Sequence, residues 1–487
     1  MMSSQSTASR RPEHWQRLGI LAICCFSLLL IGLDATAVNV ALPSVRADLD
    51  ASVAELQWTV DAYTVVMASF LMLAGATADR IGRRRTFVTG LLVFTGASVL
   101  CSVAPTIELL LAARVLQALG AAMMNPVAMS IITNTFTDPR ERAQAIGAWG
   151  AMFGLSMAIG PIVGGALVDA TGWRGIFWIN LPVGLAAIAL TLRFVPESRA
   201  PRPRRPDPVG QVLMVAFLAC LTFAIIELPG RGSGSAPVVA SFVVAALAVT
   251  GLLAYERRRV EPLIDLRFFR SVPFASSVGL AVAVFAGFGG FLFVNALYLQ
   301  DVRGLSPLDA GLATAPMAVV IAIASPISGR LVGRFGPRPS LVTAGIAGLV
   351  GASLLLGVDA STPLSGIVAA YAVFGLGLGL VNAPITNAAV SGMPRAQAGV
   401  AAGIASTSRQ VGMTLGVAVI GAVVSAHTVG SDGLATAIRP ALGLVACAEV
   451  LVLVLAFVAT SRWARASAER TARRLNPEAL VDYPGPA

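Results

Sequence analysis

The sequence is poor in charged residues, and this shortage sets the class of protein. Only 12% of its 487 residues are charged, whereas 56% are hydrophobic and the mean hydropathy is +0.79. A soluble globular protein carries about 25% charged residues, because it needs a polar exterior. The shortage therefore predicts an integral membrane protein. The apolar runs reach roughly twenty residues, the length of a spanning helix, and differ from the segments of about ten residues that build a barrel.

Histidine and cysteine are too few and too scattered to build a metal or catalytic centre. The two histidines, His14 and His427, fall in the N-terminal tail and in a predicted outer loop, so we expect no histidine relay through the membrane. All five cysteines lie within apolar runs, which indicates neither a disulfide framework nor a metal site. The sequence also lacks a Walker loop for ATP. These absences predict a protein that is not an enzyme and that uses no cofactor or metal.

Lysine is absent, so arginine alone carries a formal net charge of +10. Such a balance can indicate nucleic-acid binding, but here the arginines gather in short tracts between apolar runs. Basic loops of this kind lie against the anionic cytoplasmic leaflet of a membrane. With the N-terminus inside, and with arginines at the ends of spans counted with the adjoining loops, 28 of the 35 arginines fall in cytoplasmic segments, and only Arg114 and Arg409 lie deep inside spans. We therefore expect the bilayer as a partner and no nucleic acid.

Apolar runs bounded by charge, proline or glycine predict fourteen membrane helices. A missed or extra helix would invert the arginine bias further along the chain, and the bias never inverts, so we expect both termini in the cytoplasm. The first run is too long for a cleavable signal peptide, and we predict an anchor. The predicted spans are 18–43, 56–78, 86–104, 107–133, 142–168, 174–195, 209–229, 237–255, 273–299, 308–332, 340–357, 364–391, 397–425 and 439–461.

A basic, proline-rich break at 195–210 separates six predicted helices from the eight that follow, because its prolines cannot continue a helix. The predicted organisation is a cytoplasmic N-terminal tail at 1–17, a six-helix bundle at 18–195, a cytoplasmic linker at 196–208, two additional membrane helices at 209–255, a cytoplasmic loop at 256–272, a second six-helix bundle at 273–461 and a polar cytoplasmic tail at 462–487.

Two cytoplasmic loops repeat one pattern. Residues 75–87 and 329–340 both open with glycine and place Arg-x-Gly-x-Arg at matching offsets, as RIGRR and RFGPR. Two halves with a repeated loop indicate a transporter built from internal repeats. The first copy, GATADRIGRR, resembles the signature loop of the major facilitator superfamily, and the second has Gly333 in place of the aspartate. The resemblance implies a conformational latch at the cytoplasmic face, formed by Gly75, Asp79, Arg80, Gly82, Arg83 and Arg84.

Further stretches narrow the resemblance. GLSMAIGPIVGG at 154–165 resembles the antiporter motif of this superfamily, and Arg114 resembles the intramembrane arginine of its fourth helix. Together with LDATAVNVALP, WTVDAY and SRQVGMTLGVAV, these stretches resemble the fourteen-span drug:proton antiporters, nearest to exporters of quaternary ammonium compounds and dyes. The resemblance implies two six-helix bundles with two extra helices between them, a monomer driven by the proton gradient, and antiporter-motif residues Gly154, Gly160, Pro161, Gly164 and Gly165, with Gly150 extending the row of small residues.

Three charged side chains fall in the outer half of the N-terminal bundle. At a rise of 1.5 Å per residue, Asp34 lies roughly 14 Å, Arg114 roughly 12 Å and Asp61 roughly 8 Å below the outer surface. Charges at such depth are costly and mark functional sites, although either acid could instead hold helices together. A carboxylate balanced between burial and a nearby arginine can gain and lose a proton. We predict proton coupling at these three residues, and the choice between the two acids stays open.

The predicted function is proton-coupled antiport that exports lipophilic, cationic drugs across the cell membrane by alternating access. A dedicated exporter of one antibiotic, metabolite or lipid would share the mechanism and remains the alternative. Uptake by symport is disfavoured by the antiporter-like motif. Candidate residues of the substrate cavity, each of which could also be ordinary helix packing, are Trp58, Tyr63, Glu227, Asn295 and Arg409.

Overall fold

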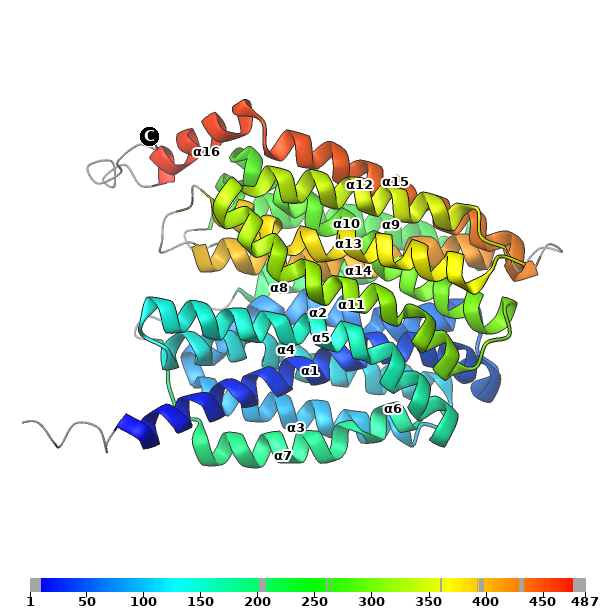
Figure 1. Ribbon diagram of the computed structural model, residues 1–487, viewed down its shortest axis with the longest axis horizontal. Coiled ribbons are helices and arrows are strands. Elements are labelled where there is room, and N and C mark those ends of the chain that lie inside the picture. The colour runs from blue at the N-terminus through cyan, green and yellow to red at the C-terminus, as the bar shows by residue number, and fades with distance from the viewer. Residues whose placement is uncertain are drawn as a thin grey trace, which may run out of the picture. The chain divides into compact units, whose positions relative to one another are not determined.

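Helices alone build the part of the chain that the structure describes, as Figure 1 shows. Thirteen helices are long and apolar enough to cross a membrane, and α5 (Pro139–Thr171) is a fourteenth span when its two bent halves count as one. Each coincides with a predicted span, which confirms the fourteen-span expectation and a multi-pass membrane protein. This computed structural model describes residues 10–200, 207–259, 262, 264–359, 361–391, 393, 398–428 and 433–475.

The helices form two compact units, and two helices, α2 and α11, are divided between them. The second half of α2 (Val53–Ile81) belongs to the first unit and its first half, up to Ser69, to the second. The first unit also contains α1 (Arg10–Leu49), α3 (Arg83–Ser102), α4 (Ile107–Thr135), α5, α6 (Gly175–Trp178), α7 (Asn180–Phe194) and residues 306–311. The second unit contains α8 (Pro208–Arg231), α9 (Ala236–Glu256), η1 (Leu266–Arg270), α10 (Val272–Leu297), η2 (Tyr298–Val302), most of α11 (Pro307–Phe335), α12 (Pro337–Leu356), α13 (Leu364–Val390), α14 (Ala398–Thr428), α15 (Gly433–Ala459) and α16 (Arg462–Leu475).

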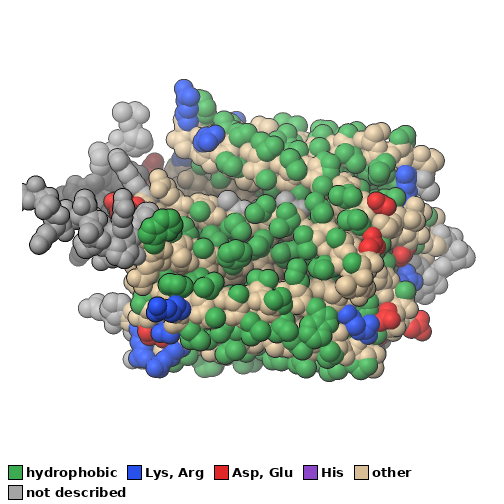
Figure 2. Space-filling model, turned by 60° about the horizontal axis from the view of Figure 1, so that its bottom comes forward, with side chains coloured by type: hydrophobic (Ala, Val, Ile, Leu, Met, Phe, Trp, Pro, Cys, Tyr) green, Lys and Arg blue, Asp and Glu red, His purple; other side chains and the backbone are tan. Residues whose placement is uncertain are grey.

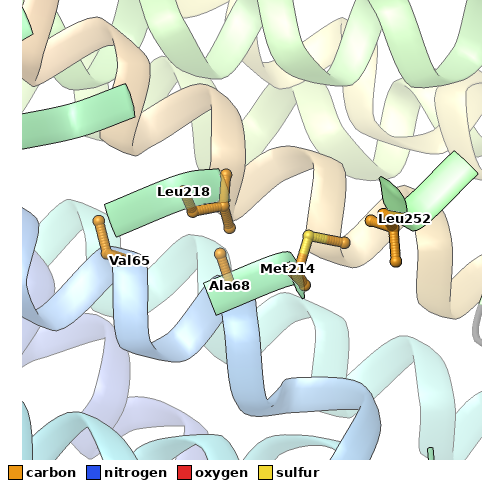
Figure 3. Packing of buried hydrophobic residues seen from close by; sticks show 5 residues of the cluster. All are labelled: Val65, Ala68, Met214, Leu218 and Leu252. Carbon is orange, nitrogen blue, oxygen red and sulfur yellow. The ribbon is translucent and has the colours of Figure 1, made fainter. Parts of the chain in front are cut away.

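In the first unit α1 lies between α4 and α5, and α3 packs on α4 and α7. In the second, α10 packs on α14 and α15, and α8 packs on α9 and α14. Figure 3 shows how the first half of α2 joins this second unit: its Val65 and Ala68 meet Met214 and Leu218 of α8, with Leu252 of α9 nearby. The two helices predicted to be additional, α8 and α9, are therefore bound into a hydrophobic core.

The repeated loops fold as two matching helix corners. Asp79 and Arg80 belong to the last turn of α2, and α3 begins at Arg83, so Gly82 alone links the two helices. Gly82 has φ +125°, and Gly336, which links α11 to α12, has φ +75°. Positive φ is strained for any residue with a Cβ, so both corners require glycine. The repeat seen in the sequence is thus a repeat in backbone geometry.

Two segments add detail to the predicted pattern. Within the predicted span 174–195, Ile179 alone separates α6 from α7, and its backbone is helical, so Gly175–Phe194 remains one span. The predicted polar tail contains a further helix, α16, which follows α15 after two residues.

The surface agrees with membrane insertion. On the face drawn in Figure 2, hydrophobic side chains cover the middle, and the arginine and acidic side chains gather at its margins. Large apolar residues such as Leu247, Ile323 and Val319 are more than half exposed, although they lie within predicted spans. Exposing so many large apolar side chains to water is unfavourable, whereas contact with the hydrocarbon of a bilayer is favourable.

Candidate functional site

A buried ion pair lies at the centre of the first unit. Asp34 of α1 and Arg114 of α4 are 2.5 Å apart between Oδ2 and Nη1, and their side chains are 0% and 1% exposed. Gln117, one turn further along α4, completes the site: its Oε1 accepts a hydrogen bond from Arg114 at 2.6 Å, and its Nε2 donates to Asp34 Oδ1 at 2.9 Å. The structure therefore brings together two of the three predicted coupling residues.

A polar chain continues from this pair across the unit. Gln117 also donates to Ser98 Oγ of α3 at 2.8 Å, and Asn180 of α7 donates to the same oxygen at 3.2 Å. Gln117, Ser98 and Asn180 are each 1% exposed or less. Side chains that are buried away from water thereby connect four helices, α1, α4, α3 and α7, to the carboxylate of Asp34.

The local sequence explains why these side chains meet. Arg114 and Gln117 are three residues apart on α4 and so share one helix face. On α1, Gly32 and Thr36 are four residues apart and face α5, where a Cβ at Gly32 would overlap the Ser156 hydroxyl. Asp34 lies midway between them in sequence and therefore on the opposite side of α1, toward α4. Because Gly32 and Thr36 place one face of α1 against α5, the carboxylate of Asp34 faces α4.

The antiporter-like motif forms a close seam between α5 and α1. A Cβ at Gly160 would overlap the Thr36 side chain, and a Cβ at Gly164 would lie 2.8 Å from Ala37 Cβ. Small residues at four-residue spacing allow such close approach of helices. The seam runs directly behind Asp34, so it fixes the depth and rotation of the helix that carries the acid.

The other motif residues have separate roles. Pro161 lies at the start of the second half of α5, where the helix bends by 41°, because proline removes a helical hydrogen bond. A Cβ at Gly165 would lie 2.8 Å from Leu308 Cα in the short segment 306–311. Gly150, which extends the row of small residues in the sequence, has no described atom within 4 Å of its Cβ position and so lies outside this close contact. Gly154 lies outside the residues whose surroundings the structure describes.

We expect Gly164→Ala to lower the free energy of unfolding by about 1–3 kcal/mol, since an added methyl group overpacks the seam. It should also slow transport, because α1 can no longer approach α5. Gly150→Ala on the same helix is the matched control and should stay within about 0.5 kcal/mol. Thermal unfolding of the purified protein measures the stability, and dye efflux from cells measures transport. Equal stability and equal efflux of the two variants would contradict the claim that Gly164 lies in a close contact between α1 and α5.

Asp61 lies in the second unit and has different neighbours. Its side chain is buried, at 0% exposure, and Oδ1 accepts a hydrogen bond from Thr64 at 3.2 Å. Thr64 in turn accepts one from Thr414 of α14 at 2.8 Å. Among the described residues, Asp61 Oδ2 has no hydrogen-bond partner and the carboxyl makes no ion pair. Burial of an unpaired carboxylate is costly, so this site differs from the ion pair of Asp34.

One turn before Asp61, Gln57 ties α2 to α14. Its Nε2 donates to the main-chain oxygen of Ala418 at 2.9 Å, and the amide occupies the space that a Cβ at Gly421 would take. Sequence inspection gives no signal for this contact, because it depends on which helix lies opposite.

The candidate cavity residues all lie in the second unit, where two of them share one cluster. Trp58 packs against Phe223, with ring centroids 6.3 Å apart, and Glu227 accepts a hydrogen bond from Arg231 at 2.6 Å on the same helix. Arg231 also lies over the Phe223 ring, so Trp58 and Glu227 belong to one cluster at the end of α8.

The remaining candidates are held by other helices. Tyr63 is buried, at 1% exposure. Asn295 of α10 accepts a hydrogen bond from the Tyr371 hydroxyl of α13. Arg409 of α14 is half-buried and donates to Thr386 Oγ1 at 2.7 Å.

The latch residues form a compact group in the first unit. Asp79 Oδ1 accepts hydrogen bonds from Arg83 at 3.0 and 3.3 Å, and the main-chain oxygen of Asp79 accepts one from Ala200. Arg80 is exposed, and a Cβ at Gly75 would make ordinary contact with Pro126, at 3.7 Å.

An acid that the sequence did not predict, Glu197, completes this group. Glu197 lies 2.5 Å from the position of a Cβ at Gly82, and its two oxygens accept the main-chain N–H groups of Arg84 and Arg85 at 3.1 and 3.3 Å. It therefore caps the first turn of α3, where a negative charge is favoured. The only signal in the sequence is an acid shortly after α7.

This helical architecture and its buried polar network are those of a membrane transporter. The chain belongs to the Major Facilitator Superfamily, whose family model matches residues 24–417. It is therefore a multi-pass protein of the cell membrane.

Sequence and structural similarity to other transporters agrees with this membership. The chain is 38% identical over 399 residues to the multidrug resistance protein Stp of Mycobacterium tuberculosis, an alignment that covers 82% of this chain and 74% of the relative. It is 36% identical over 421 residues to the tetracenomycin C resistance and export protein of Streptomyces glaucescens, covering 86% and 77%. Among solved structures, an auto-inhibited POT family peptide transporter matches with a TM-score of 0.68 at 18% identity, covering 92% of this chain and 97% of the other, which supports the fold.

Proposed function

We propose that the protein exports lipophilic, mostly cationic drugs in exchange for protons, by alternating access and as a monomer without a cofactor. The names of the relatives support drug export, because Stp is named a multidrug resistance protein. The observation that carries proton coupling is the fully buried pair of Asp34 and Arg114. Both termini lie in the cytoplasm in this proposal, as the arginine bias indicates.

The pair can act as a switch because it cannot change charge without rearranging. Protonation of Asp34 would leave Arg114 charged and buried, at a cost of several kcal/mol. Gln117 would then lose its charged acceptor, and the hydrogen bonds to Ser98 and Asn180 would shift with it. A second conformation that opens the pair to the outer face becomes favourable in that state. Asp61, which is buried and makes no ion pair with any residue that the structure describes, is the second group that can carry a proton.

The proton gradient supplies enough energy for this exchange. A force of roughly 180 mV provides about 4 kcal/mol per proton, which sustains a drug concentration ratio of roughly a thousandfold.

A second candidate function is export of one dedicated antibiotic, with the same mechanism. The observation that favours it is the relative from Streptomyces glaucescens, which is named for resistance to a single compound and its export.

The breadth of protection separates the two candidates. The gene is expressed in a host that lacks its own efflux pumps, and growth inhibition is measured for chemically unrelated cations, dyes and neutral antibiotics. Multidrug export predicts raised tolerance to several unrelated lipophilic cations, abolished by a protonophore. Tolerance to a single compound would favour the dedicated exporter, and tolerance to none would contradict both.

A further inference from the structure

Helix α16 is a strongly basic segment directly after the last membrane span. Its fourteen residues contain Arg462, Arg465, Arg470, Arg473 and Arg474, against the single acid Glu469. It follows α15, which ends at Ala459, after only two residues. So many charges cannot enter the hydrocarbon, and so short a connection cannot carry the helix far from the membrane. α16 therefore begins at the boundary between lipid and water.

One face of α16 is fastened to the second unit. Its buried residues, Ala464, Ser467, Ala468 and Thr471, are small and follow a helical spacing of three and four. Ser467 Oγ accepts a hydrogen bond from the main-chain N–H of Val272 at 2.9 Å, the first residue of α10. Because the span of α10 starts there, the contact holds α16 beside the membrane edge rather than letting it project into water.

The remaining faces of α16 are exposed and differ in the residues that they carry. Trp463 is 62% exposed, and Arg470 and Arg474 are exposed as well. At 100° per residue these three lie within about 40° of each other on one flank, whereas Arg462 and Arg465 lie on the other flank. An indole beside two guanidinium groups is the composition of a surface at the level of lipid headgroups.

We propose that the flank of α16 formed by Trp463, Arg470 and Arg474 binds the phosphate groups of anionic lipids in the leaflet next to it. Guanidinium groups bind phosphate with two parallel hydrogen bonds, and the indole sits among the headgroups. Each basic residue near an anionic surface strengthens the attraction about fivefold. The lipid thereby holds α16, and through Ser467 the beginning of α10, at the membrane surface.

Fluorescence quenching by brominated lipid tests this contact on the full chain. The protein is reconstituted in vesicles of equal parts phosphatidylcholine and phosphatidylglycerol, with bromine near the headgroup of either one lipid or the other. Both leaflets have the same composition, so the direction of insertion does not matter. The Trp463 signal is the difference between each protein and its Trp463→Phe counterpart, because the chain has six tryptophans.

The expected result is stronger quenching of Trp463 when the bromine is on phosphatidylglycerol, by about twofold or more. Arg470→Gln with Arg474→Gln should abolish this excess. Arg462→Gln with Arg465→Gln removes the same charge from the other flank of α16 and should retain most of it. Equal quenching by the two lipids in the unaltered protein would overturn the proposal. So would quenching by acrylamide in water without any by lipid, which would place this flank in solution.

Discussion

Asp34→Asn is expected to abolish proton-driven export and to lower the free energy of unfolding by about 3–5 kcal/mol. The amide preserves the shape of the side chain but leaves Arg114 charged, 1% exposed and without the carboxylate 2.5 Å away. Removing one partner of a buried ion pair costs far more than the pair itself contributes. Thermal unfolding of the purified protein and efflux of a cationic dye from energised cells measure the two effects.

An exposed ion pair that also involves α1 is the matched control. Asp48 at the end of α1 contacts Arg174 at 2.6 Å, but these side chains are 46% and 36% exposed. Asp48→Asn should cost less than about 1 kcal/mol and leave efflux intact. Combining Asp34→Asn with Arg114→Gln removes both buried charges and should recover much of the lost stability without restoring export. A double variant that is less stable than Asp34→Asn alone would contradict the pairing.

Asp61→Asn should behave differently, because it should keep the stability of the protein while reducing cation export by more than about tenfold. If the carboxyl is neutral in its buried site, an amide of the same shape replaces it at a cost of less than about 1 kcal/mol. The variant loses the ability to exchange a proton and can no longer offer a negative charge to a cation. Unfolding and efflux are measured as for Asp34→Asn, with a neutral drug added as a second substrate.

Thr64→Val separates the role of the proton on the Asp61 carboxyl from the role of the hydrogen bond that this carboxyl accepts. It removes the hydrogen bond of 3.2 Å to Asp61 and keeps the volume of the side chain. Export should be reduced only slightly, with its pH dependence shifted. If Asp61→Asn instead destabilised the protein as much as Asp34→Asn, Asp61 would have to be an ionised and paired carboxylate, contrary to the assignment.

The membrane architecture could be predicted from the sequence because it rests on local properties. The length of each apolar run predicts a span, and the distribution of arginines tests the number of spans. The structure contains a helix at each of the fourteen predicted positions. The repeated loops were also visible, because a corner that needs positive φ selects glycine at Gly82 and Gly336.

The candidate site was predicted in part. Depth along the helices placed Asp34 and Arg114 at similar levels, and the structure pairs them. Gln117 was missed, although its spacing of three from Arg114 gives it the same helix face. Contacts such as Glu197 with the start of α3, or Gln57 with α14, depend on how helices are placed side by side. The residue pattern along a single helix does not indicate which other segment lies next to it.

The most direct test of the account is to count protons during transport by the purified protein. It is reconstituted in sealed vesicles with a pH-sensitive dye inside, and a cationic substrate is added without any imposed gradient. The account predicts that entry of the substrate into vesicles drives protons out, and that Asp34→Asn eliminates this proton flux. Proton movement of unchanged size in Asp34→Asn vesicles that still transport substrate would contradict the claim that this buried acid couples the two.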